Sequence, residues 1–321
     1  MADRESFAQV PGGKCWFAVA GAEKPSLPLV TVHGGPGVSH DDLAPLRTLS
    51  DERPVVFYDQ LGGGRSDRPV DERLWRVERF VDELDCVRAA AGLDRFHLFG
   101  QSWGTVVALE YALAQAGRVA TLILASPYVS MPRARQDIIR LRRALPSAVR
   151  AALDQLEAGG LTGSRQYRAL VREFTNRHLV RAAPWPEPVT RSMATFNAPV
   201  LHALWGKDWL RFDGPLVTHD RLDRLAELRM PVLLTCGRFD QVPADTVDLY
   251  RSRIPRAETA VFDESAHYAH AEEPDRFAAV VRSFLSRSET LGCVSLDDEH
   301  NADRQVPQLN ECGDAPPASP D

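Results

Sequence analysis

Short apolar runs alternate with longer amphipathic stretches along most of this chain. Six of the runs have the length and composition of buried strands: Pro28–His33, Pro54–Tyr58, Phe96–Phe99, Thr121–Ala125, Pro231–Thr235 and Thr259–Phe262. Between the second and the third, apolar residues recur at spacings of three and four from Leu74 to Val87, which predicts a helix, and Gly92 follows as a stop signal. Buried strands that alternate with helices predict an α/β fold, with a mostly parallel sheet covered by helices on both faces. Cys15–Ala20 precedes these strands and is predicted to start an antiparallel edge.

The alternation stops in the middle of the chain. From about residue 128 to residue 228 the chain shows no clear strand, and its amphipathic segments, such as Ile138–Leu145 and Tyr167–Val180, favour helices. A helical segment between two strands of one sheet predicts an inserted cap. We therefore expect a core made of residues 1–127 and 229–287, closed by a last helix around Phe277–Leu285, and a cap made of residues 128–228.

The C-terminal segment differs in composition from the rest. Residues 288–321 are acidic, contain four prolines and offer little apolar surface to bury. Ordering such a segment costs conformational entropy that few contacts offset, so we predict a disordered tail.

Composition excludes several classes of protein. The chain has 321 residues, of which 44% are hydrophobic, and its formal net charge is −6. The acidic excess comes from the C-terminal segment, so the body has no basic surplus to attract nucleic acid. No apolar run approaches the ~20 residues of a membrane helix, and Met1–Val10 has no hydrophobic core of the kind expected in a signal peptide. Five scattered cysteines favour neither a disulfide framework nor a zinc site, and fit a reducing cytoplasm.

One short motif points to nucleophilic chemistry. Residues 100–104 read Gly-Gln-Ser-Trp-Gly, directly after a predicted strand and before a predicted helix. A strand-to-helix turn this tight crowds its backbone, so glycines flank it and the serine is exposed at the sheet edge. We therefore predict that Ser102 is a nucleophile.

A serine nucleophile needs an oriented base. His267 follows the last predicted strand in a short loop, and the nearby His270 is the rival. Asp240 follows the strand before it, so both side chains are expected at the carboxyl edge of the sheet. The chain order Ser102, Asp240, His267 is the order typical of the α/β-hydrolase triad.

Acyl transfer also requires two backbone N–H donors that stabilise the developing oxyanion. Trp103, directly after the nucleophile, is predicted to supply one, and the glycine loop at residues 33–37 the other. His33 has no second ligand at a useful spacing, so we predict that it braces this loop and binds no metal.

These motifs together resemble the proline iminopeptidase family of α/β-hydrolases. The resemblance rests on His-Gly-Gly-Pro-Gly at 33–37, Asp-Gln-Leu-Gly-Gly-Gly-Arg-Ser at 59–66, the 100–105 elbow and Gly-Arg-Phe-Asp at 237–240. It implies an α/β-hydrolase core with a helical cap, no cofactor, and an exopeptidase-like or amidase-like activity on small molecules or short peptides. It also implies that Ser102, Asp240 and His267 form the triad and that the amides of Gly35 and Trp103 form the oxyanion hole.

This chain departs from the family where a free amine would be bound. In the branch it most resembles, one carboxylate follows the catalytic Asp, and here that position is Gln241. A second lies in the cap, where the matching position is Leu201. A buried ammonium without a carboxylate is costly, so these changes disfavour aminopeptidase substrates. Asp208 or Asp213 in the cap remain as replacements.

The cap is also expected to supply an apolar substrate pocket. Its aromatic candidates are Phe196, Trp205 and Trp209, each of which also suits core packing. The main alternative within enzymes is an esterase, lactonase or acyltransferase of a biosynthetic pathway, favoured by the neutral Gln241 and Leu201. Outside enzymes, a catalytically silent ligand-binding hydrolase fold is disfavoured by the complete set of triad residues. The sequence makes no prediction of oligomeric state.

Overall fold

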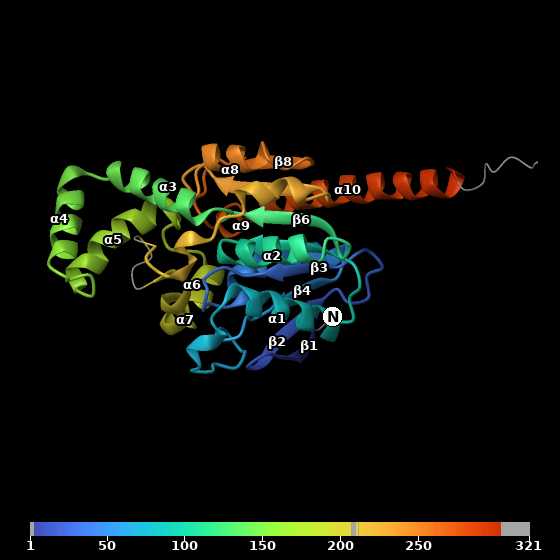
Figure 1. Cartoon of the computed structure of the whole chain (residues 1–321), viewed down its shortest axis with the longest axis horizontal. Coiled ribbons are helices and arrows are strands. Elements are labelled where there is room, and N and C mark those ends of the chain that lie inside the picture. The colour runs from blue at the N-terminus through green and yellow to red at the C-terminus, as the bar shows by residue number, and fades with distance from the viewer. Residues whose placement is uncertain (1–2, 207–209, 211, 303–321) are drawn as a thin grey trace, which may run out of the picture.

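An eight-stranded sheet forms the centre of the molecule (Figure 1). The structure is a computed structural model that describes residues 3–206, 210 and 212–302. The strands are β1 (Arg4–Val10), β2 (Gly13–Ala20), β3 (Leu29–Val32), β4 (Val55–Tyr58), β5 (Phe96–Gln101), β6 (Val119–Ala125), β7 (Val232–Gly237) and β8 (Ala257–Phe262). Their spatial order is β1-β2-β4-β3-β5-β6-β7-β8, and the six strands from β3 onward are mutually parallel. The predicted α/β-hydrolase sheet is thus confirmed.

The antiparallel edge was predicted only in part. Strand β2 pairs antiparallel with β4, as expected, but the true edge is β1, which pairs with β2 on its far side. The first four of the seven residues in β1 are all exposed. An exposed edge strand carries no apolar run, so the hydrophobic pattern did not reveal it.

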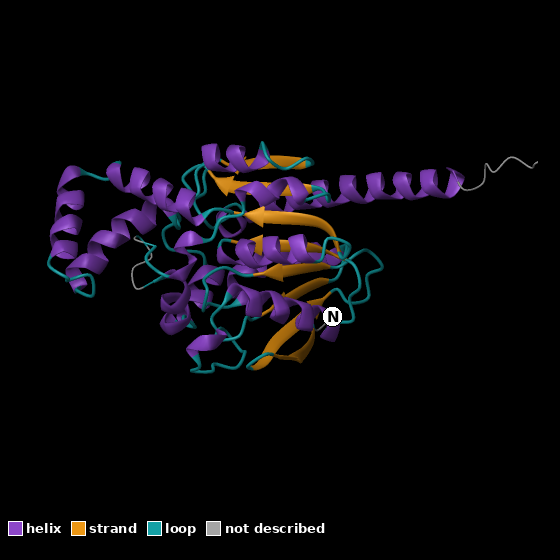
Figure 2. Ribbon diagram, in the orientation of Figure 1, coloured by secondary structure: helices purple, strands orange, loops and turns teal. Residues whose placement is uncertain are grey.

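Helices cover both faces of the sheet (Figure 2). One face carries α1 (Val77–Ala90), α2 (Trp103–Ala114) and α8 (Ala244–Arg251), and the other carries the 3-10 helix η1 (His40–Asp51), α9 (Ala269–Glu272) and α10 (Pro274–Ala302). Successive strand residues alternate between the two layers: Val56 and Tyr58 pack with the first group of helices, and Val55 and Phe57 with the second. Two apolar layers therefore hold the sheet rigid.

The chain between β6 and β7 is helical. It contains α3 (Met131–Arg143), α4 (Ser147–Ala158), α5 (Arg165–His178), α6 (Glu187–Ala194), α7 (Ala198–Trp205) and the 3-10 helices η3 (Pro215–Thr218) and η4 (Leu222–Glu227); a further 3-10 helix, η2, spans Glu72–Leu74. Helices α3, α4 and α5 form a lobe beyond one end of the sheet (Figure 1), while α6 packs on η1. This segment occupies the place of the predicted cap.

The first part of the predicted disordered tail, residues 288–302, is helical in the structure. These residues continue α10, which extends beyond the body of the protein (Figure 1). No proline interrupts the helix before Pro307, and Glu289 accepts hydrogen bonds from Arg53 and from the buried His97. These polar contacts anchor the helix where the sequence offered little apolar surface. The rest of the predicted tail, 303–321, lies outside the described residues.

Within the described part of the chain, no helix is long and apolar enough to cross a membrane.

Candidate active site

The turn between β5 and α2 places Ser102 at the carboxyl edge of the sheet. Ser102 has φ 53° and ψ −121°, a conformation that non-glycine residues rarely adopt. A Cβ atom at Gly100 would lie 2.5 Å from the carbonyl oxygen of Gly104, and one at Gly104 would lie 2.1 Å from that of Val32. Both flanking positions therefore require glycine, as the sequence motif indicated.

The structure brings the three predicted triad residues together. Asp240 follows β7 and His267 follows β8, so the parallel strands deliver both to the edge where Ser102 lies. Nε2 of His267 is 2.7 Å from Oγ of Ser102, and Nδ1 of His267 is 2.7 Å from Oδ1 of Asp240. All three side chains are buried. With Nδ1–H donating to the carboxylate, Nε2 is left to accept the serine proton.

A residue that the sequence reasoning missed completes this arrangement. Ser126, directly after β6, donates a 2.6 Å hydrogen bond to Oδ2 of Asp240, while the backbone N–H of Val242 donates to Oδ1 at 3.0 Å. The sequence signal that could have identified it is its position directly after β6, the strand that lies between β5, which leads to Ser102, and β7, which leads to Asp240. These donors fix the orientation of the carboxylate.

His270, the other candidate for the base, lies in a different environment from His267. His270, on α9, is buried between the rings of Tyr268 and Phe277, with centroid distances of 5.6 and 5.8 Å. Burial lowers the pKa of its imidazole to about 3, so the ring is neutral at physiological pH. Only His267 of the two contacts Ser102 by a hydrogen bond among the described residues, and His270 is part of the core.

A hydrogen-bond network ties the glycine loop to the elbow. The backbone N–H of Gln60 donates to Nε2 of His33 at 3.0 Å, and Nδ1 of His33 donates to the carbonyl of Gly34 at 2.9 Å. Nε1 of Trp103 donates to Oε1 of Gln60 at 2.7 Å. Burial lowers the pKa of His33 to about 4, which keeps Nε2 an acceptor. His33 thus braces the loop, and the described residues include no group of three side chains suited to a metal ion.

A cavity of about 330 Å³ opens above Ser102. Gly35, Ser102 and His267 line it, together with four of the predicted pocket residues, which are Phe196, Leu201, Trp205 and Gln241. The sequence reasoning did not identify its other lining residues, which are Val38, Tyr128, Thr175, Leu179, Met193, His202 and Tyr268. Trp209, also predicted for this pocket, lies outside the described residues.

No carboxylate lines this cavity among the residues that the structure describes. Gln241 is 5% exposed, and its Oε1 atom has no hydrogen-bond partner. Asp213 was named as a replacement acid, but it lines a different cavity, and Asp208 lies outside the described residues. The described lining of the cavity therefore carries no carboxylate and is mostly apolar above the serine.

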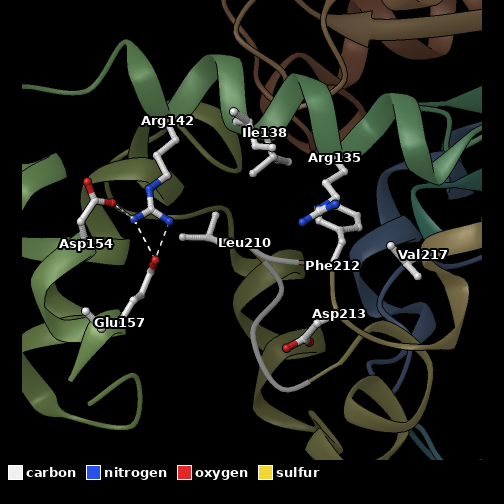
Figure 3. A pocket seen from close by; sticks show the side chains of 11 residues that line it. Arg135, Ile138, Arg142, Asp154, Glu157, Leu210, Phe212, Asp213 and Val217 are labelled. Carbon is white, nitrogen blue, oxygen red and sulfur yellow. Dashed lines mark hydrogen bonds and ion pairs between the residues drawn. The ribbon is translucent and has the colours of Figure 1, made fainter. Parts of the chain in front are cut away.

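This second cavity is larger, about 640 Å³, and lies between α3, α4 and the side chains of Leu210, Phe212, Asp213 and Val217 (Figure 3). Three of its charged side chains pair with one another: the guanidinium of Arg142 points at Asp154 and Glu157 and pairs with them at 2.7 and 2.8 Å (Figure 3). The rings of Trp205 and Phe212 are tilted by 45° with their centroids 5.0 Å apart, and they lie between the two cavities, since Phe212 lines the larger one and Trp205 the smaller one. The larger space does not include Ser102, so the smaller one is the candidate active site.

Known proteins share this architecture over nearly their full length. A family model described as the alpha/beta hydrolase fold matches residues 28–274. A proline iminopeptidase of Heyndrickxia coagulans is 37% identical over 283 residues, which span 88% of this chain and 98% of that protein. One of Saccharolobus solfataricus is 30% identical over 90% of this chain and 94% of that protein. The crystal structure of a proline iminopeptidase from Mycobacterium smegmatis matches with a TM-score of 0.84 at 32% identity, covering 90% of this chain and 100% of that one.

Proposed function

Because the chain belongs to the proline iminopeptidase-like α/β-hydrolases, we propose that it is a serine hydrolase that cleaves small neutral amides, peptides or esters through an acyl-enzyme. One observation carries the proposal. The hydroxyl of Ser102 lies 2.7 Å from Nε2 of His267, at the floor of a cavity that no described carboxylate lines.

Acylation begins with attack of the Ser102 oxygen on the substrate carbonyl carbon. As the new C–O bond forms, the serine proton moves to Nε2 of His267, and the carboxylate of Asp240 stabilises the imidazolium. The carbonyl oxygen becomes an oxyanion that accepts hydrogen bonds from the N–H groups of Gly35 and Trp103. When the tetrahedral intermediate collapses, the bond to the leaving amine or alcohol breaks and His267 returns the proton to that group.

Deacylation uses the same groups in the same order. Water attacks the acyl carbon and gives a proton to Nε2 of His267, which then returns it to the departing Ser102 oxygen. The products are a free acid and the restored serine. The cavity walls, held by the two-layered core, keep the acyl group in place between the two steps.

The residues that line the cavity determine which substrate charge the site accepts. A free amine next to the scissile carbonyl would enter this space as an ammonium, and taking it out of water without a counter-charge costs several kcal/mol. Gln241 offers only a neutral carboxamide and Leu201 only methyl groups. Amine-blocked or uncharged substrates are therefore preferred to free aminoacyl amides.

Matched anilides test this proposal. We expect kcat/KM at pH 8 to be higher for an N-acylated aminoacyl anilide than for the same anilide with a free amine, and both turnovers to depend on Ser102. A preference of roughly tenfold or more for the free amine, equal to about 1.4 kcal/mol of transition-state binding, would contradict the proposed substrate class.

An esterase is the second candidate. The mostly apolar lining, with Leu201 and Trp205 facing the serine cavity, accepts an alkyl or aryl ester as readily as an amide. A panel of aryl esters beside the acylated anilides separates the two, because an esterase would leave the anilides intact.

A further inference from the structure

The carboxamide of Gln241 is an unused hydrogen-bonding group inside the active-site cavity. Its Oε1 atom is buried and has no hydrogen-bond partner among the described residues, although buried polar groups are nearly always paired. Gln241 lines the same cavity as Ser102 and His267. An orphaned acceptor in that position indicates that a group on the substrate supplies the missing donor.

The position of this carboxamide is fixed by the triad itself. Gln241 lies between Asp240 and Val242, and the N–H of Val242 donates to Oδ1 of Asp240 at 3.0 Å. The backbone on both sides of Gln241 is therefore tied to the carboxylate that orients His267. A substrate group bound by Gln241 is held at a set place relative to the reacting carbonyl.

The chemistry of a carboxamide selects its partner. An ammonium would require a negative charge, which no described lining residue provides. The unpaired acceptor Oε1 fits an uncharged N–H donor, such as the N–H of a secondary amide. An ester or lactone in the same position has no N–H and would leave Oε1 unpaired.

We propose that Gln241 is a specificity residue that binds the N–H of a secondary amide next to the scissile carbonyl, so that the preferred substrates are N-acylated aminoacyl amides or esters. This inference rests on the proposed function. The acyl group has a matching surface, since Met193, Phe196 and Leu201 line the same cavity with apolar side chains.

An isosteric pair of substrates tests the inference. The 4-nitroanilides of N-acetylalanine and of O-acetyllactic acid differ only in that the N–H of the first is replaced by an oxygen in the second. Wild-type protein is expected to show a kcat/KM roughly tenfold higher for the N–H compound, the value of one buried hydrogen bond. In Gln241→Met, which keeps the side-chain length but has no acceptor oxygen, the ratio is expected to fall to about one.

Two further variants make the result specific. Gln241→Glu keeps an acceptor oxygen and is expected to keep the preference for the N–H compound. Gln155→Met makes the same chemical change on the exposed face of α4, away from the cavity, and is expected to leave the ratio at its wild-type value. Thermal unfolding gives an independent readout: because Oε1 makes no hydrogen bond that the substitution could remove, Gln241→Met should melt no lower than wild type.

Equal turnover of the two substrates by wild type, or a preference that persists in Gln241→Met, would overturn this inference alone. Failure of the wild-type protein to cleave either compound, or cleavage that survives Ser102→Ala, would overturn the proposed function as well. If Gln241→Met does not fold, the ratio of kcat/KM for the two substrates in wild type and in Gln241→Glu decides whether an acceptor at this position sets the preference.

Discussion

The hydroxyl of Ser126 lies 2.6 Å from Oδ2 of Asp240 and donates a hydrogen bond to it. The same hydroxyl is 3.1 Å from the carbonyl oxygen of His267. Ser126 has φ 53° and directly follows β6, so the strand itself aims the hydroxyl at the carboxylate. One buried serine thus contacts both the acid and the base of the candidate triad.

Replacing this serine should therefore impair catalysis more than folding. In Ser126→Ala the carboxylate loses a charge-assisted hydrogen bond, and kcat is expected to fall by about tenfold, with a small change in melting temperature. Steady-state kinetics on an acylated anilide measures the effect. Ser147→Ala, on the exposed start of α4, serves as the control and should leave kcat unchanged. An unaltered kcat in Ser126→Ala would show that the other contacts of Asp240 suffice to orient it.

The elements that the sequence predicted correctly are those with strong local patterns. Fully buried parallel strands such as β3 and β5 appear as continuous apolar runs. Ser102, Asp240 and His267 follow the parallel strands β5, β7 and β8, and this placement brings the three residues to one edge. The pattern required no knowledge of packing, because strand ends of a parallel sheet share an edge.

The parts that escaped prediction depend on contacts between distant segments. Strand β1 is mostly exposed, and its pairing with β2 comes from backbone hydrogen bonds that any sequence can make. The continuation of α10 depends on Glu289 meeting Arg53 and His97, which lie 236 and 192 residues away. The role of Ser126 likewise appears only when β6 and β7 are neighbours. Periodicity carries no information about such pairs.

His270 should matter for stability rather than for turnover. Burial holds its folded-state pKa near 3, below the usual 6.5. Such a group favours folding above pH 6.5, and the contribution is lost as the pH falls toward 3, because only the unfolded state then takes up the proton. We expect the unfolding free energy of wild type to drop relative to His270→Phe below pH 6.5, by up to about 1.4 kcal/mol per pH unit.

Urea titrations at pH 7, 5 and 4 measure that difference. The kinetic control is His267→Ala, which should lose activity with little loss of stability. A His270→Phe protein that folds normally but cannot cleave its substrate would show that the base has been misassigned.

Glu289 is expected to stabilise the anchorage of α10 to the body. Hydrogen bonds from His97 and Arg53 lower the pKa of its carboxyl to about 2, from a usual 4.5. A depressed carboxyl pKa contributes stability that is present above pH 4.5 and is lost as the pH falls toward 2. Glu289→Gln should therefore lower the unfolding free energy by about 1 kcal/mol at pH 7, a modest value because the pair is partly exposed to water.

The difference between Glu289→Gln and wild type should be the same at pH 7 and pH 5.5 and should shrink at pH 3. A difference that does not change with pH would mean that the carboxylate charge is not what anchors the helix.

Restoring a carboxylate to the cap side of the cavity should reverse the preference for neutral substrates. Leu201→Glu places a negative charge in the cavity that holds Ser102, and we expect kcat/KM for a free-amine anilide to rise by roughly tenfold, since an ion pair in a partly desolvated site is worth about 1–2 kcal/mol. The N-acylated anilide should become a poorer substrate. Leu201→Gln, which adds polarity without charge, is the matched control and should not produce the rise.

The most direct test of the account is covalent labelling of Ser102 by an organophosphonate, followed by mass spectrometry of the intact protein and its peptides. We predict a single phosphonyl group on the peptide that contains Ser102, no adduct in Ser102→Ala, and a reaction slowed on the order of 10³-fold or more in His267→Ala. His270→Ala should label at nearly the wild-type rate per folded molecule. An adduct on another residue, or amide and ester cleavage that persists undiminished in Ser102→Ala, would contradict the assignment of Ser102 as the nucleophile.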